Sequence, residues 1–127
     1  MAFTSGALTV PLTGALLFAG GEIAGVANPE GKPLIIVDCK IYVDTPSTGA
    51  ANINVGIAAA ATTSSTTLIN ALAINGAITG LAYHGMTALA AKGAAIVWAA
   101  NQFLTATGSA DSTGFTGRFL VTYLRIA

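Results

Sequence analysis

The stretch Pro33–Asp44, PLIIVDCKIYVD, decides the fold. Its odd-numbered positions are all apolar, whereas half of its even-numbered positions are charged. A strict period of two with one apolar face, rich in β-branched residues, predicts a strand that buries that face. We expect the odd-numbered side chains to point into the core: Ile35, Val37, Cys39, Ile41 and Val43.

A second alternating stretch, Asn52–Ala58, follows after a turn at Thr45–Gly49. Its apolar side chains also recur every second residue, at Ile53, Val55 and Ile57. Two such stretches joined by a short turn are expected to pair as a hairpin and to share one core.

The next segment changes period. A run of Ser and Thr can cap a helix, and Leu68, Ile69 and Leu72 then fall at helical spacing. One short helix is therefore expected over Thr66–Leu72. Further strands are expected at Ala94–Trp98, Phe103–Thr107 and Phe115–Ile126, the first two joined as partners by a tight turn.

Short strands separated by turn residues, with one small helix, indicate an all-β fold. We expect an antiparallel jelly-roll-like β-sandwich over residues 28–127. Residues 1–27 carry one charge and many small residues, and are expected to form an extended N-terminal arm. Short strands are expected in this arm near Ala7–Val10 and Ala15–Phe18, and the arm should lie on its own body or on a neighbour.

The composition favours assembly with other protein chains. Charged residues make up 8% of the 127 residues and hydrophobic residues 54%, so apolar surface exceeds what a small core needs. No uncharged run is long and apolar enough to suggest a membrane helix. The first basic residue is Lys32, so the positively charged start of a signal peptide is missing and none is expected. Five scattered basic residues and zero net charge argue against nucleic acid as a partner.

Candidate reactive residues lack partners in the sequence. His84 and Cys39 are the single histidine and cysteine, and neither has neighbours that would make a metal ligand set or an activated nucleophile. Asp38 and Asp44 lie about 20 Å apart on one strand, too far for paired acid–base catalysis. Asp111 suits a turn better than a calcium site. We therefore expect no enzyme activity, no cofactor and no metal.

Four stretches together resemble small jelly-roll structural proteins of tailed bacteriophages, the decoration (cement) and minor head proteins. They are IIVDCKIYVDTPSTGAANINVGIA, ATTSSTTLINALAI, KGAAIVWAANQFLTATGSADSTGFTG and RFLVTYLRI, and they span roughly residues 34–127. The resemblance implies a homotrimer that binds the major capsid protein on the outside of the phage head and stabilises the shell. It also implies synthesis in the host bacterial cytoplasm and a final place on the virion surface.

The residues expected at an interface with the capsid or a neighbouring subunit are four apolar arm residues, the single tryptophan and two arginines. They are Phe3, Leu8, Leu17, Phe18, Trp98, Arg118 and Arg125. Trp98 suits the core equally well, and Phe119 is expected in the core. The alternative is a receptor- or glycan-binding jelly-roll module of a fibre or head spike, which should expose aromatic or polar loops.

Overall fold

The computed structural model describes residues 4–13, 25–74, 80–82, 96–108 and 114–125. These residues form nine strands and no helix. The strands are β1 (Thr4–Thr13), β2 (Val26–Ala27), β3 (Leu34–Thr45), β4 (Asn52–Ala58), β5 (Ile69–Ala73), β6 (Gly80–Ala82), β7 (Val97–Trp98), β8 (Phe103–Gly108) and β9 (Thr116–Arg125).

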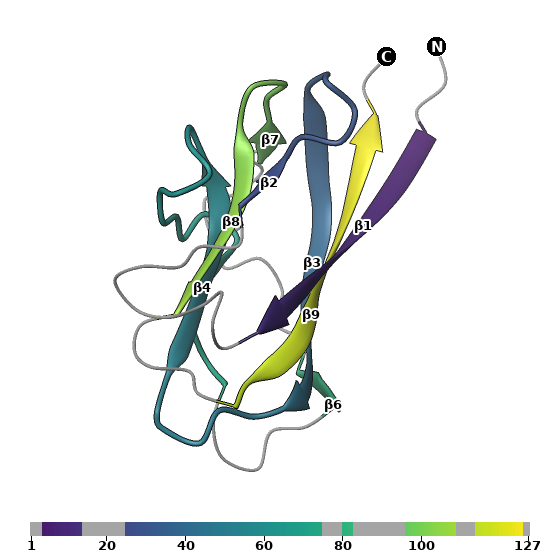
Figure 1. Ribbon diagram of the computed structural model, residues 1–127. Coiled ribbons are helices and arrows are strands. Elements are labelled where there is room, and N and C mark those ends of the chain that lie inside the picture. The colour runs from purple at the N-terminus through teal and green to yellow at the C-terminus, as the bar shows by residue number, and fades with distance from the viewer. Residues whose placement is uncertain (1–3, 14–24, 75–79, 83–95, 109–113, 126–127) are drawn as a thin grey trace.

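The strands make two antiparallel sheets that face each other as a sandwich (Figure 1). One sheet has the order β1-β9-β3-β6, with β7 also paired to β3, and the other has the order β2-β8-β4-β5. A single buried cluster lies between them, and its largest members include Trp98, Phe115 and Phe119. The expected all-β sandwich is confirmed, while the narrower jelly-roll assignment stays a prediction.

The decisive stretch forms the centre of the five-stranded sheet, but it does not keep one face throughout. Cys39, Ile41 and Val43 are buried as expected, whereas Val37 is 46% exposed and Ile35 only partly buried. The cause is a register shift against β9 between Ile36 and Asp38. A β-bulge adds one residue and reverses which positions face the core. The expected facing is therefore wrong before the bulge and right after it.

The two expected hairpins do not form. β3 pairs with β9, and β4 pairs with β5 and β8, so β3 and β4 belong to different sheets and share only the core between them. Likewise, β7 pairs with β3 while β8 pairs with β2 and β4. Alternation correctly predicted the strands and their common core, but it does not encode which strand is the neighbour.

The expected helix over Thr66–Leu72 is wrong, because Ile69–Ala73 is strand β5. Val55 opposes Ile69 and Ile53 opposes Leu72, so two residues of β5 face the single residue Asn54. This irregularity spaces the buried side chains three apart, as a helix would. The side chain of Asn54 provides a hydrogen-bond acceptor at this irregularity, since its Oδ1 accepts the backbone N–H of Ala71 at 2.8 Å.

The Ser/Thr run does not cap a helix but hydrogen-bonds to strand β4. The Thr67 hydroxyl oxygen accepts the backbone N–H of Ile57 at 2.8 Å, on β4. Ser65 lies against Gly56, where an added Cβ would come within 2.3 Å of its Oγ. Hydroxyl side chains offer the backbone an alternative to helical hydrogen bonds, and here they attach a loop to the four-stranded sheet.

The first described residues belong to the sandwich. β1 pairs with β9 along all of its ten residues, and Val10 and Leu12 are buried in the core. The expected strand near Ala7–Val10 is part of β1, and the one at Ala15–Phe18 lies outside the described residues. Position 6 of β1 favours glycine, because the Tyr123 ring covers Gly6 and would lie 2.7 Å from an added Cβ.

Candidate interaction surface

The outer face of the five-stranded sheet carries a group of exposed and partly exposed polar, aromatic and aliphatic side chains. The register aligns Thr9, Leu120 and Lys40 in one row across β1, β9 and β3. Pro11, Arg118 and Tyr42 form the next row. Side chains of directly opposed residues project to the same face, so these rows lie side by side.

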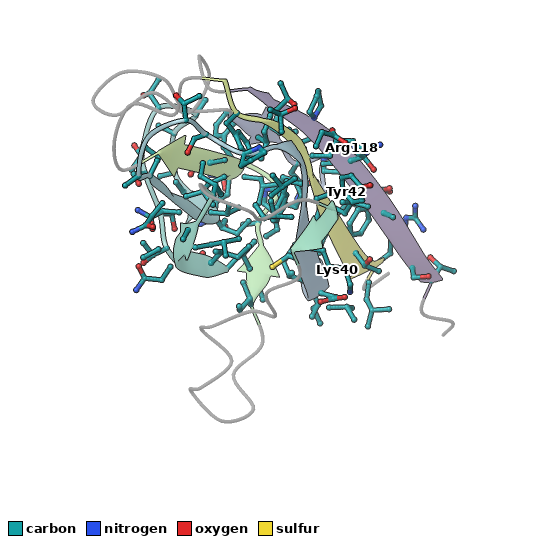
Figure 2. The ribbon with its side chains drawn as sticks, turned by 90° about the horizontal axis from the view of Figure 1, so that it is seen from below. Lys40, Tyr42 and Arg118 are labelled. Atoms are coloured by element: carbon teal, nitrogen blue, oxygen red, sulfur yellow. The ribbon has the colours of Figure 1, made fainter. Side chains whose placement is uncertain are left out.

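Arg118 organises this face. Its guanidinium lies over the Tyr42 ring, 4.7 Å from the ring centroid, and its Nη2 donates to Asp44 Oδ1 at 3.2 Å. Figure 2 labels Tyr42 and Arg118, which come from neighbouring strands β3 and β9. Stacking and pairing restrict the rotamers of the long arginine side chain, which lowers the entropy lost when a partner binds.

An open hollow of about 280 Å³ lies beside this pair, lined by Thr9, Tyr42, Arg118 and Leu120. Its lining combines a hydroxyl, an aromatic ring, a cation and an aliphatic side chain. Tyrosine and arginine contribute most to binding in many protein interfaces, and they do so where apolar neighbours exclude water. The hollow can therefore receive a side chain from a binding partner.

The charges on this face cancel. Lys40 Nζ donates to Asp38 Oδ2, and Arg118 pairs with Asp44, so two cations meet two anions. Both pairs are partly exposed and add little to stability. A face with paired charges costs less to desolvate than one with bare charges, which suits a surface that becomes covered.

Apolar side chains continue the face. Leu120 is 38% exposed, Val37 at the bulge 46%, and Val97 on β7 45%. Val97 is paired with Ile35, and Ile35 in turn with Leu124, so these three make an apolar row. The exposed Leu120, Val37 and Val97, together with the partly buried row, favour a protein interface.

A second polar cluster closes one end of the sandwich. Glu30 Oε2 accepts from Arg125 Nη2 at 3.0 Å and from the Tyr123 hydroxyl at 3.1 Å. Arg125 Nη1 also donates to the Ser5 carbonyl oxygen at 2.8 Å and to Thr4 Oγ1 at 3.3 Å. The cluster therefore connects the turn after β2, the end of β9 and the start of β1.

Asn28 holds this turn in place. Its Oδ1 accepts the N–H groups of Glu30 and Gly31 at 2.9 and 3.0 Å. Its amide nitrogen donates to the carbonyl oxygens of Lys32 and Trp98, both at 2.9 Å. This arrangement is an Asx-turn that positions the Glu30 carboxylate for Arg125.

The cluster shifts the pKa values of its members. The hydrogen bond from Arg125 lowers the pKa of Glu30, and the hydrogen bond to Glu30 raises the pKa of Arg125. Burial raises the pKa of Tyr123, and the hydrogen bond to Glu30 adds to the effect. At neutral pH the cluster is therefore a charged ion pair with a neutral phenol.

Cys39, the single cysteine of the chain, is buried in the core. Burial raises the pKa of the Cys39 thiol to about 12, so it stays protonated and inert. No three His, Cys, Asp or Glu side chains in the described ranges gather as metal ligands would. His84 and Asp111 lie outside those ranges. None of the described segments includes a helix long and apolar enough to cross a bilayer.

A chain in the structure of the cyanophage Pam1 capsid asymmetric unit has a similar fold. The TM-score is 0.61, the sequence identity is 18%, and the match covers 96% of this chain and 84% of that chain. A fold similar to that of this chain therefore occurs in a phage capsid structure. No protein-family model and no curated protein sequence matches.

The expected interface residues lie in three different settings. Arg118 lies on the outer face, and Arg125 lies half-buried in the cluster with Glu30. Leu8 packs against the core of its own chain, and Trp98 is fully buried there, with its Nε1 donating to the Gln102 carbonyl oxygen at 3.0 Å. Trp98 is thus covered by its own chain, because the turn after β7 folds back to satisfy the indole. Phe3, Leu17 and Phe18 lie outside the described residues.

Sequence reasoning missed Tyr42, Leu120 and Glu30. Tyr42 and Leu120 carried one available signal, since each is a large side chain on the face of its strand opposite the buried one. Glu30 carried no local signal, because its partners Tyr123 and Arg125 come from the far end of the chain.

Proposed function

We propose that this protein is a structural component of a phage virion, a decoration protein that binds the outside of the head as a homotrimer and stabilises the shell. Its role is mechanical and not catalytic. The fold similarity to a chain of the cyanophage Pam1 capsid asymmetric unit carries this proposal. The same proposal includes a jelly-roll topology for the sandwich and the major capsid protein as its binding partner.

The outer face of the five-stranded sheet supports the proposal in physical terms. It offers an oriented Tyr42–Arg118 pair, exposed aliphatic side chains such as Leu120, and charges that are already paired. Interfaces between protein chains favour such a mixture of aromatic, arginine and aliphatic groups. Many identical weak contacts on one particle then add up through avidity.

A receptor- or glycan-binding module of a fibre or head spike is the second candidate. The hollow beside Tyr42 favours it, because an aromatic ring next to hydroxyl and charged groups can bind a sugar. This candidate predicts binding to host surface polysaccharide in the absence of any capsid.

Co-sedimentation with expanded phage heads that lack the protein tests the proposal, with the free mass measured by light scattering. Saturable binding by a trimer supports it. Leu120→Asp on the outer face should weaken binding, whereas Ala73→Asp, at an exposed position of the other sheet, is the matched control and should not. A monomer that ignores heads and binds polysaccharide would instead establish the second candidate.

A further inference from the structure

The described parts of the two sheets end in four edges, and three of these are short or irregular. β2 has two residues, β6 and β7 have three and two, and β5 has five with an irregular register. Ala71 of β5 also has a positive φ of 59°. Short strands and bulges are devices by which natural sheets prevent further strands from pairing with an edge.

The edge formed by β1 lacks most of these devices. The strand has ten residues, pairs with β9 without a register shift, and contains no Lys, Arg, Asp or Glu. Figure 2 shows β1 along the rim of its sheet. Among the described strands only β9 pairs with β1, and Pro11 near its end is the one residue without a backbone N–H, so Thr4–Val10 offers an uninterrupted row of backbone groups.

Pro11 also indicates which backbone groups are available. Proline is tolerated in a sheet where its backbone nitrogen points away from the neighbouring strand. The nitrogen of Pro11 should therefore point away from β9. Ser5, Ala7 and Thr9 share its parity and therefore present N–H and C=O groups outward. The Ser5 carbonyl oxygen accepts a hydrogen bond from the Arg125 side chain at 2.8 Å, as an outward-facing carbonyl can.

We propose that this edge pairs antiparallel with β1 of a second copy of the chain, about a two-fold axis at Ala7. Centring on Ala7 opposes Ser5 to Thr9 of the second copy and keeps the core-facing sides of both sheets on one side. Three outward-facing pairs offer about six backbone hydrogen bonds, in two of which the Ser5 carbonyl oxygen would accept from the second copy as well as from Arg125.

Charge is the reason for choosing a second copy as the occupant. Self-pairing about a two-fold axis opposes identical groups, and like charges directly opposed would prevent it. β1 has none, and the arginines nearest to it on β9 are already paired, Arg118 with Asp44 and Arg125 with Glu30. Two copies of this edge can therefore pair without repulsion between like charges, which two copies of a charged edge cannot.

This inference does not rest on the proposed function. A three-fold contact elsewhere on the surface would leave β1 available, and both contacts together would give dimers of trimers. One strand pair buries little surface, so the association should be weak and should depend on protein concentration.

Sedimentation equilibrium over a concentration series tests the pairing. Ala7 is exposed, so Ala7→Lys and Ala7→Glu should each fold normally and oppose like charges at the axis. We expect the wild-type mass to double with rising concentration. Each variant should weaken this step about tenfold, and an equimolar mixture of the two should restore it. Ala73→Lys, at an exposed position of β5 in the other sheet, is the matched control and should associate like the wild type.

Three results would overturn the inference: a wild-type mass independent of concentration, unchanged doubling in either Ala7 variant, or no recovery in the mixture. A thermal melt of each variant separates lost pairing from lost folding. If the Ala7 variants lose the doubling step but still bind phage heads, the pairing stands independently of the proposed function. If they keep doubling and heads are not bound, both ideas fail separately.

Discussion

Two valines of β3 provide a matched test of the bulge. Val37 and Val43 are the same residue type, on the same strand, at odd-numbered positions. Sequence periodicity therefore predicts equal burial for both. The structure instead leaves Val37 46% exposed and buries Val43 completely. Val43→Ala should consequently destabilise the fold, and Val37→Ala should change the free energy of unfolding by less than about 0.5 kcal/mol.

The magnitude for Val43→Ala follows from its complete burial. Removing two buried methyl groups costs about 1.6 kcal/mol in transfer free energy. A cavity of about 50 Å³ that fails to collapse adds about 1.2 kcal/mol at most. The unfolding entropy of a chain of 127 residues is about 0.27 kcal/mol/K. A loss of about 1.6 to 2.8 kcal/mol should thus lower Tm by about 6 to 10 °C.

Urea unfolding followed by tryptophan fluorescence reports this difference, because Trp98 is the single tryptophan and is fully buried. Both variants are compared with the wild type at one protein concentration, so that any association affects all three alike. Equal destabilisation by the two substitutions would refute the bulge and restore an uninterrupted alternation along β3.

Three further predictions follow from the packing and the polar cluster. Gly117→Ala should cost about 1 to 3 kcal/mol, because its Cβ would lie 2.4 Å from the Tyr42 carbonyl oxygen in the centre of the sheet; a thermal melt unchanged from the wild type would contradict this. Ile41→Asp should abolish folding by placing an unpaired charge in the core, and a soluble protein with a wild-type circular dichroism spectrum would overturn the facing of β3. The lowered pKa of Glu30 means that its ion pair stabilises the fold above the ordinary pKa of 4.5 and is lost as pH falls through the folded value. Between neutral pH and about pH 3, Tm should therefore fall less in Glu30→Gln than in the wild type, and parallel pH profiles would show that the pair contributes nothing.

Both main errors of sequence reasoning have one physical cause. A bulge adds a residue without changing the local composition, so Val37 looks like a core residue and the Leu68–Leu72 spacing looks helical. Side-chain alternation reports the pleat of an isolated strand, whereas bulges depend on the partner strand. Strand positions after the bulge, such as Ile41, were predictable because the pleat is regular there.

The candidate surface was predictable in part for a similar reason. The alternation along the last strand puts Arg118 opposite the core-facing Phe119, so its exposure could be expected. Its partners Tyr42 and Asp44 could not, because they come from β3 and depend on the β3–β9 register. Trp98 could not be placed from the sequence, because an aromatic residue suits an interface and a core equally well. The structure buries it in the core of its own chain.

The central claim is a place on the outside of a phage head. Cryo-electron microscopy of heads assembled with and without this protein tests it most directly. The account predicts added density on the outer surface at the three-fold and quasi-three-fold positions, with the outer face of the five-stranded sheet against the shell. Density confined to a fibre or spike, or heads without added density at saturating protein, would contradict it.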